Sequence, residues 1–164
     1  MKVVVQRSKE ASVSVEGNVV GSIEHGLVLL VGFTKGDSLN EINYLVDKII
    51  NLRIFDDDEG VMNKSLIDVN GDILSISQFT LYADTRKGRR PSYINALGGD
   101  DAIGLYRLFN DKGGITMADY QIFSDGACDI GFEKAAVSVS PSVVGASMPS
   151  YLFPYYEFSG WILN

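Results

Sequence analysis

The stretch SQFTLYADTRKGRRPS, residues 77–92, holds the side chains best suited to chemistry. In an extended strand, alternate side chains share a face, so Gln78 and Thr80 would stand about 7 Å apart on one surface. An amide and a hydroxyl at that spacing can hold a polar ligand, although the same pattern is typical of a half-buried strand that binds nothing. The cations that follow can attract phosphates or form a solvated loop: Arg86, Lys87, Arg89 and Arg90. The residues alone leave both interpretations open.

Two other residues are weaker candidates for catalysis. His25, the only histidine, lies between two predicted strands, where a histidine is usually a turn residue and not a general base. Cys128, the only cysteine, has the acidic neighbours Asp125 and Asp129, whereas a reactive thiolate needs an electropositive setting. Triads assemble from distant segments, so sequence order does not exclude His25, but we expect neither residue to carry a reaction.

No metal or cofactor site is predicted. One cysteine and one histidine cannot form a disulfide within the chain or a Cys/His zinc set. The acidic run 56–60 would start a calcium loop, but the positions that need Gly and Glu hold Val61 and Ile67. No glycine-rich phosphate-binding motif follows a predicted strand, so a nucleotide cofactor is not expected either. We interpret the acidic run as a solvated turn.

Length and composition predict one globular domain. The chain has 164 residues, 46% of them hydrophobic, which is enough to bury a single core. No apolar stretch approaches the roughly 18 residues of a membrane span, and the amino-terminal segment lacks the apolar core of a secretory signal. We therefore expect a cytoplasmic protein with no membrane contact. The net charge of −7 argues against general nucleic-acid coating, so an anionic partner would dock at the local basic cluster.

Two elements are expected to support residues 77–92. The apolar run 27–33 predicts a central strand that is covered on both faces. Residues 39–51 predict an amphipathic helix, because Ser38 and Glu41 form a capping box ahead of an apolar stripe at helical spacing.

The other elements are read from turn and capping signals. Asn70 and Gly71 predict a hairpin turn that starts a long strand over 72–83. Asp100 or Asp101 is expected to cap a second helix. The other expected strands are a hairpin over 11–23 and single strands over 2–8, 52–56, 115–123 and 135–140.

Four stretches occur in the order and spacing of a known family: VVVQR at 3–7, NLRIF at 51–55, MNKSL at 62–66 and the stretch 77–92. They resemble the D-aminoacyl-tRNA deacylase family, whose members remove D-amino acids mischarged onto tRNA. The resemblance runs from Met1 to about Asp111 and implies a single deacylase-like domain over 1–164, with residues 112–164 diverging. It implies an α/β, three-layer fold with a mainly antiparallel β core and two principal helices. It also implies a homodimer with the active site at the interface, the aminoacylated 3′ end of tRNA as substrate, and no cofactor.

The resemblance assigns roles to individual residues. The family's Ser-Gln-X-Thr motif corresponds to Ser77, Gln78, Phe79 and Thr80, which would line the pocket for the aminoacyl ester. Backbone N–H groups of Gln78 and Phe79 would stabilise the developing oxyanion, provided that sheet pairing leaves them free. Thr80 as nucleophile would need a base that the local sequence lacks, and the family reaction is also ascribed to the terminal ribose 2′-OH. The residues expected to contact substrate elsewhere are Arg7, Met62, Arg86, Lys87, Arg89 and Arg90.

The carboxyl-terminal part departs from the family pattern. The family's Asn-X-Gly-Pro-X-Thr motif, which rejects L-amino acids in the partner's pocket, is absent, because the chain has no Gly-Pro dipeptide. The nearest stretch, 139–143, places Ser140 before Pro141, and Arg7 resembles the residue that braces the missing loop. Divergence that alters substrate choice, loss of activity and a changed reading frame beyond about residue 112 all fit this pattern.

The sequence therefore predicts hydrolysis of the ester bond of D-aminoacyl-tRNA, which releases the D-amino acid and free tRNA. One alternative is a non-catalytic homologue that still binds tRNA. Another is a deacylase with relaxed chirality, because the selecting motif is missing.

Overall fold

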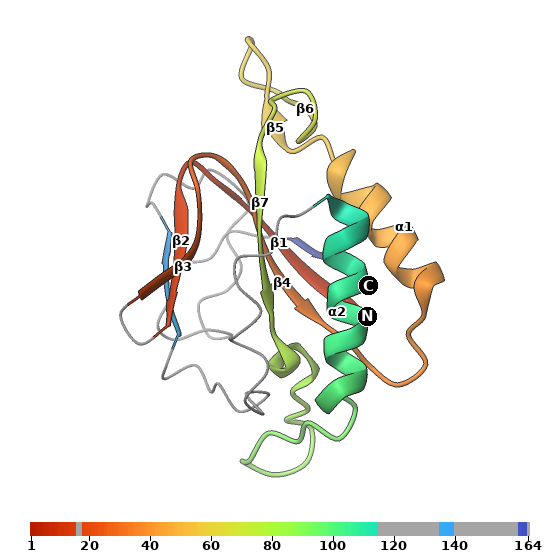
Figure 1. Cartoon of the computed structure of the whole chain (residues 1–164). Helices are drawn as coiled ribbons and strands as arrows, with labels where there is room; N and C mark the ends of the chain where they lie inside the picture. Colours follow the sequence, from red (N-terminus) through yellow and green to blue (C-terminus); the bar gives the residue numbers. More distant parts are fainter. Residues whose placement is uncertain (16–17, 115–134, 140–160, 164) are drawn as a thin grey trace.

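The computed structural model describes residues 1–15, 18–114, 135–139 and 161–163 (Figure 1). Strands alternate with two long helices and a short 3₁₀ helix, η1, within these ranges. In chain order the elements are β1 (Lys2–Ser8), β2 (Ala11–Val15), β3 (Asn18–Ile23), β4 (Gly26–Gly32), α1 (Leu39–Ile50), β5 (Phe55–Asp56), β6 (Met62–Lys64), β7 (Asp72–Ser77), η1 (Phe79–Tyr82), α2 (Gly99–Gly113), β8 (Ala135–Val139) and β9 (Trp161–Leu163).

Strand β4 lies in the middle of the main sheet, whose order is β7-β4-β1-β9. Every residue of β4 is buried, as its continuous apolar run predicts. It pairs antiparallel with β1 and parallel with β7. Leu27, Leu29 and Val31 belong to a core shared with both helices, while Val28 belongs to a second cluster on the opposite face. The central strand expected over 27–33 is confirmed.

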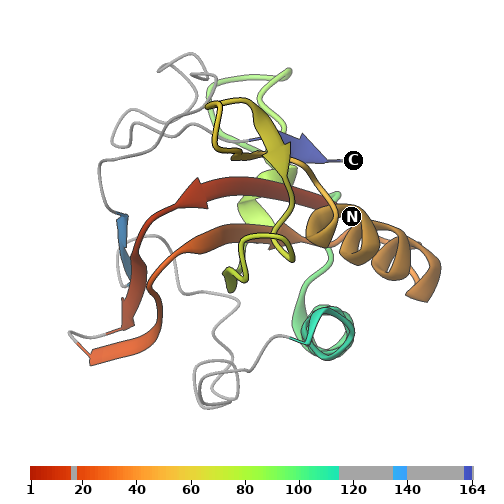
Figure 2. The same cartoon turned by 90° about the horizontal axis from the view of Figure 1, so that it is seen from above.

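The fold has three layers. Helices α1 and α2 cover one face of the main sheet, and the small sheet β3-β2-β8 lies on the other side, as Figure 1 and Figure 2 show. On the helical side, Val3 and Val5 of β1 pack in one cluster with Ile42 and Ile49 of α1 and Phe109 of α2. This larger cluster is the main hydrophobic core, because burying these side chains supplies most of the apolar area. The expected three-layer α/β fold with a mainly antiparallel core is confirmed.

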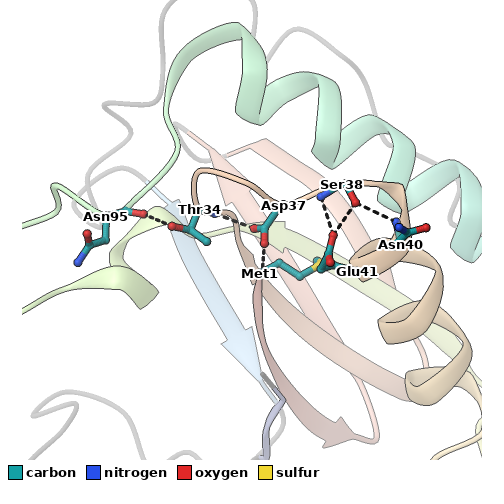
Figure 3. A network of polar contacts seen from close by, with 7 residues as sticks. All are labelled: Met1, Thr34, Asp37, Ser38, Asn40, Glu41 and Asn95. Atoms are coloured by element: carbon teal, nitrogen blue, oxygen red, sulfur yellow. Dashed lines mark hydrogen bonds and ion pairs between the residues drawn. The ribbon is translucent and has the colours of Figure 1, made fainter.

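Helix α1 begins where the sequence predicts. Ser38 is the N-cap, and its Oγ accepts a hydrogen bond from Asn40 N at 3.3 Å. Glu41 Oε2 accepts in return from Ser38 N at 2.8 Å, which completes the capping box (Figure 3). The hydrogen bond from the Ser38 hydroxyl, with backbone donors, lowers the pKa of Glu41. Lys48 in the last turn suits the negative end of the helix dipole.

Helix α2 begins differently from the prediction. Its N-cap is Gly98, and no side chain caps it, so the expectation that Asp100 or Asp101 caps the helix is wrong. Both aspartates lie in the first turn instead, where carboxylates are favoured by the positive end of the helix dipole. The helix ends at Gly113, and Gly114 follows in the left-handed conformation with φ 64°.

Two expectations for the middle of the chain are corrected. Within 52–56 only β5 is a strand, because Ile54 N turns back to Leu52 O at 3.1 Å before β5 begins. Asn70 adopts a turn conformation with φ 48° and leads into β7. However, β7 pairs parallel with β4, so the turn at Asn70 and Gly71 does not form a hairpin.

The remaining expected strands are partly described. β2 and β3 pair antiparallel, which confirms the hairpin over 11–23. β8 confirms the strand expected at 135–140 and pairs antiparallel with β2. The strand expected over 115–123, Cys128 and Ser140 lie outside the described residues. No helix in the described ranges has the length and apolar character that crossing a membrane requires.

Candidate active site

Strand β7 ends at Ser77, next to the end of its partner β4. Gln78 N donates to Val31 O at 2.7 Å, and after this bond the chain turns into η1. Gly32 permits the close approach, because a methyl group at Gly32 would lie 2.8 Å from Gln78 O. The strand expected over 72–83 is therefore wrong after Ser77, since β4 ends at Gly32 and offers no further pairing.

The turn brings Gln78 and Thr80 together more closely than a strand would. Gln78 Nε2 donates a short hydrogen bond to Thr80 Oγ1, and both residues are half-buried. The hydroxyl oxygen is thus engaged as an acceptor, while its own hydrogen can still be donated to a ligand. The amide and the hydroxyl are therefore joined to each other on a turn, whereas the sequence placed them side by side on one face of a strand.

The two backbone amides expected to bind the oxyanion differ in availability. The Gln78 N–H is used by Val31 O, so the condition set for this group is not met. The Phe79 N–H, in contrast, has no acceptor among the residues that the structure describes. It is the first amide of η1, and the first amides of a helix have no partner within the helix. Phe79 therefore supplies an amide that can donate to a ligand.

Neither a base nor a metal site accompanies Thr80 in the described part of the chain. The hydrogen-bond partner of its hydroxyl there is the Gln78 amide, which cannot accept a proton as a base would. His25 is exposed at the start of β4, the strand's opposite end, with Nε2 3.1 Å from Val69 O. No group of three His, Cys, Asp or Glu side chains is placed to hold a metal ion among these residues.

The carboxyl-terminal end of η1 borders an open hollow of about 290 Å³. Lys2 Nζ donates to Leu81 O at 3.2 Å and lies 4.7 Å from the centre of the Tyr82 ring. Burial, with the charge of Asp37 adding to it, raises the pKa of Tyr82 to about 12, so its hydroxyl stays protonated. The hollow is lined by Lys2, Tyr82, Ala83, Asp84, Thr85, Arg86 and Asn95.

A polar network fixes the segment at Asn95 against the end of β4 (Figure 3). The amino-terminal ammonium of Met1 forms a short, buried ion pair with Asp37. Asp37 Oδ2 accepts from Thr34 N at 2.7 Å, and Thr34 Oγ1 donates to Asn95 O at 2.5 Å. Nearby, the ring of Tyr93 meets that of Phe79 edge-on, with centroids 5.2 Å apart. The segment after the basic cluster is thus held beside η1.

The predicted substrate-binding residues fall into two separate places. Arg86, Lys87, Arg89 and Arg90 are exposed on the loop that follows η1. Arg7 and Met62 lie elsewhere: Arg7 Nη1 donates to Ile54 O at 2.8 Å and to Asp56 Oδ1 at 3.0 Å, and Met62 pairs with Asp56 across the β5–β6 hairpin.

The register of β1 and β7 on β4 shows how far Arg7 lies from the 77–80 turn. Arg7 is level with Leu27 on β4, whereas Ser77 is level with Val31. These two levels are about 13 Å apart along the strand. Within one chain, the fold does not bring Arg7 and the 77–80 turn together.

Sequence reasoning missed several residues of this region. Lys2 and Tyr93 reach η1 only through tertiary packing, so no local pattern marks them. Asp84 carried a local signal, because an aspartate in a turn often accepts a hydrogen bond from the backbone N–H two residues on, here that of Arg86.

Comparison with known proteins gives a consistent family. The family model described as D-Tyr-tRNA(Tyr) deacylase matches residues 4–126, which extends past Asp111. A protein of Clostridium tetani named D-aminoacyl-tRNA deacylase is 54% identical over 127 residues, which cover 77% of this chain and 85% of that protein. One of Brevibacillus brevis with the same name is 59% identical over 112 residues, which cover 68% and 77%.

Two solved structures have similar folds. The c-Myc DNA Unwinding Element Binding Protein matches with a TM-score of 0.68 and 32% identity, over 85% of this chain and 91% of that one. A probable eukaryotic D-amino acid tRNA deacylase matches with a TM-score of 0.64 over 87% and 94%; at 16% identity this likeness shows the fold alone.

Proposed function

This chain belongs to the D-aminoacyl-tRNA deacylase family, and we propose that the turn 77–80 is where it carries out the family reaction. As a deacylase it is an ester hydrolase, whose products are the D-amino acid and free tRNA. The observation that supports this location is the Phe79 N–H, which has no acceptor in the described structure and belongs to the residue directly before Thr80.

The proposed chemistry relies on positioned hydrogen-bond donors. Water attacks the ester carbonyl carbon, the carbonyl oxygen becomes negative, and the bond to the ribose oxygen then breaks as that oxygen takes up a proton. The Phe79 N–H donates to the oxygen that becomes negative, which lowers the barrier. Thr80, held by Gln78, orients the substrate and is not the nucleophile, because no base adjoins it among the described residues. The terminal ribose 2′-OH of the substrate relays the proton from the attacking water to the leaving ribose oxygen.

Hydrolysis of matched substrates tests the activity and its chirality. The protein is incubated with D-tyrosyl-tRNA and with L-tyrosyl-tRNA, and ester loss is compared with the spontaneous rate. We expect the D-ester to be hydrolysed. Hydrolysis of both esters would favour the relaxed deacylase, which the missing Gly-Pro dipeptide suggests. Loss of neither ester would reject the enzyme and leave the tRNA-binding homologue.

Two substitutions at one position test the proposed amide. Phe79→Pro removes the N–H but fits the first position of a helix, where proline is tolerated. Its matched control, Phe79→Ala, removes the same ring and keeps the N–H. We expect Phe79→Pro to hydrolyse D-tyrosyl-tRNA about 10² to 10³ times more slowly than Phe79→Ala, the usual loss for one oxyanion donor.

The same pair of variants can reject the proposal. Thermal unfolding and circular dichroism establish that both variants are folded. Equal rates in folded Phe79→Pro and Phe79→Ala would show that this amide does not stabilise the transition state, whatever the activity of the unmodified chain.

We also propose a homodimer in which Arg7 and Met62 of one chain approach the 77–80 turn of its partner. The resemblance assigns all of these residues to one site, whereas a single chain keeps them apart. Apolar side chains exposed around the β5–β6 hairpin suit such an interface: Val61 at 51%, Met62 at 48% and Ile67 at 62% exposure.

Light scattering tests this assembly. We expect the unmodified chain to have twice the mass of one chain, and Met62→Asp to weaken the association, because a charge would be buried in the interface. Tyr44→Asp, on the exposed face of α1, is the control that should leave the mass unchanged. A monomeric unmodified chain would reject the dimer.

We propose that the protein acts in the cytoplasm, because its substrate is aminoacyl-tRNA.

A further inference from the structure

The basic cluster belongs to a loop with a closed stem. Asp84 N donates to Ser92 O at 2.8 Å, and Ser92 N donates to Asp84 O at 2.9 Å. Gly88 at the tip has φ 81°, a left-handed conformation that glycine adopts at little cost. We call residues 84–92 the basic loop. These two backbone bonds close the base of the loop.

One of the four cations is committed inside this loop. Arg86 Nε lies 2.9 and 3.1 Å from the two carboxylate oxygens of Asp84, and Arg86 Nη2 donates to Asp84 Oδ2 at 2.6 Å. The Arg86 backbone N–H also donates to Asp84 Oδ1 at 3.0 Å. A two-pronged contact of this kind fixes both geometry and direction, and it occupies the Nε–Nη2 edge of the guanidinium, one of the two edges that can bind a phosphate.

The other three cations have no such commitment. Lys87, Arg89 and Arg90 are exposed, and none of them forms an ion pair or a side-chain hydrogen bond with a described residue. In a chain of net charge −7, this is a local concentration of available positive charge.

The basic loop is also close to the proposed active site along the chain. Asp84 follows Thr80 by four residues, so its Cα lies within about 14 Å of that of Thr80. The Tyr93 ring, just after the loop, touches the Phe79 ring. An RNA whose 3′ end occupies the 77–80 turn would therefore bring its last phosphates to this loop.

We propose that Asp84 is a positioning residue that uses Arg86 to hold the loop, and that Lys87, Arg89 and Arg90 contact phosphates next to the 3′ end of aminoacyl-tRNA. The identity of the RNA rests on the proposed function; the division of roles among the cations rests on the loop. The hydrogen bond from Arg86 lowers the pKa of Asp84 to about 2, so this carboxylate is charged whenever RNA is present.

Salt dependence of binding to uncharged tRNA tests which cations contact phosphates. Each phosphate contact steepens the fall of log affinity with log salt by roughly 0.7 to 0.9. We expect Lys87→Ala, Arg89→Ala and Arg90→Ala each to make this slope shallower by about one contact. Lys9→Ala is the control, because Lys9 is exposed beyond the opposite end of β1 from Lys2. It should leave the slope unchanged.

A charge-neutral double variant tests the role of Asp84. Asp84→Ala with Arg86→Ala removes the internal pair without changing net charge. We expect affinity to fall roughly tenfold at every salt concentration with an unchanged slope, because the loop must be ordered on binding while the same phosphates are contacted. With D-tyrosyl-tRNA as substrate, KM should rise and kcat should stay the same.

Three results would overturn the proposal. Unchanged slopes in the single variants would remove Lys87, Arg89 and Arg90 from the contact. A shallower slope in the double variant would show that Arg86 itself binds RNA. Unchanged affinity in the double variant would show that Asp84 positions nothing. Because binding is measured with uncharged tRNA, these outcomes are distinct from failure of the enzyme to hydrolyse its ester.

Discussion

The two ends of the main sheet are both rich in polar contacts, but they are built differently. We call the end at the 77–80 turn the site end, and the end next to the β5–β6 hairpin the hairpin end. At the site end, Lys2 contacts Leu81 and Thr34 contacts Asn95, and these partners are 79 and 61 residues apart in sequence. At the hairpin end, Arg7 contacts Asp56 from a distant segment, but Asp57 inside the turn accepts hydrogen bonds from residues two to six positions away. The hydrogen bonds at the site end fix separate segments relative to one another, whereas those to Asp57 only close a turn. The geometry of the proposed active site therefore depends on the bonds at the site end.

Burial separates the two ends in the same way. The ion pair between Met1 and Asp37 is almost fully enclosed, with side-chain exposures of 0% and 6%. The ion pair between Lys64 and Asp58 in the hairpin has exposures of 38% and 98%. Water screens the second pair, so its contribution to folding is small, while loss of one partner from the first leaves an uncompensated buried charge.

Removing one charge from each pair is expected to have very different effects. Asp37→Asn keeps an acceptor for Thr34 N but leaves the Met1 ammonium without a counter-charge, so the free energy of unfolding should fall by about 3–5 kcal/mol. Asp58→Asn should leave the midpoint of urea unfolding unchanged. Equal midpoints for the two variants would show that the site end is no more tightly built than the hairpin.

Alanine at two glycines compares the backbone of the two ends. At Gly32, a Cβ would meet Gln78 O at 2.8 Å, so the turn must shift, and we expect a loss of about 1–3 kcal/mol. Hydrolysis of D-tyrosyl-tRNA should fall as well, because the Phe79 amide moves with the turn. At Gly60, nothing lies within 4 Å, and only the φ of 77° is unfavourable, at about 1 kcal/mol. Gly60→Ala should retain full activity, and Gly32→Ala with full activity would separate the turn from catalysis.

The sequence predicted those parts of the fold whose signals are local. The capping box at Ser38 placed α1, and the continuous apolar run placed β4 in the centre of the sheet. The end of β7 was not predictable in this way, because it depends on where β4 stops, and that is a tertiary fact. The turn at Asn70 shows the same limit: its conformation was readable, but its partner strand was not.

The candidate site follows the same division. Gln78 and Thr80 were singled out by their types, the resemblance assigned residues 77–80 to the site, and the structure keeps Gln78 and Thr80 together. Their strand geometry was wrong, and with it the role expected for the Gln78 amide, which Val31 O occupies. Which cation of the basic cluster is committed could have been read from Asp84, whereas the contribution of Lys2 requires the folded chain.

Mixing two inactive variants would show whether the ends meet across a dimer. Arg7→Ala alters the hairpin end and Phe79→Pro the site end, so each homodimer should be inactive. If every site takes Arg7 from one chain and Phe79 from the other, random exchange leaves one intact site in each heterodimer. We then expect about a quarter of the unmodified activity in an equimolar refolded mixture. No recovery, despite heterodimers seen by mass spectrometry, would place both residues in one chain's site or outside it.

The smallest expected effect is a difference between Asp84 and Asp57 in how their pKa values respond to salt. Arg86 lowers the pKa of Asp84 to about 2, whereas the pKa of Asp57 is lowered mainly by hydrogen bonds from Asn63 and the Val61 backbone, which are neutral donors. A carboxylate whose pKa is lower in the folded state stabilises the folded state above its unfolded pKa. This stabilisation is lost as the pH falls through the folded pKa. For Asp84 this window runs from about 4 down to about 2, so the basic loop should stay closed at pH 5.

Carboxyl-carbon NMR can follow both groups as pH falls. In 1 M salt the pKa of Asp84 should rise toward that of a free aspartate, because its partner is a cation, and that of Asp57 should move much less. Arg86→Ala should remove the salt effect at Asp84 and leave Asp57 as it was. If the pKa of Asp84 is unchanged both in 1 M salt and in Arg86→Ala, the basic loop is held by its backbone alone. The two ends of the molecule would then differ less than their contacts suggest.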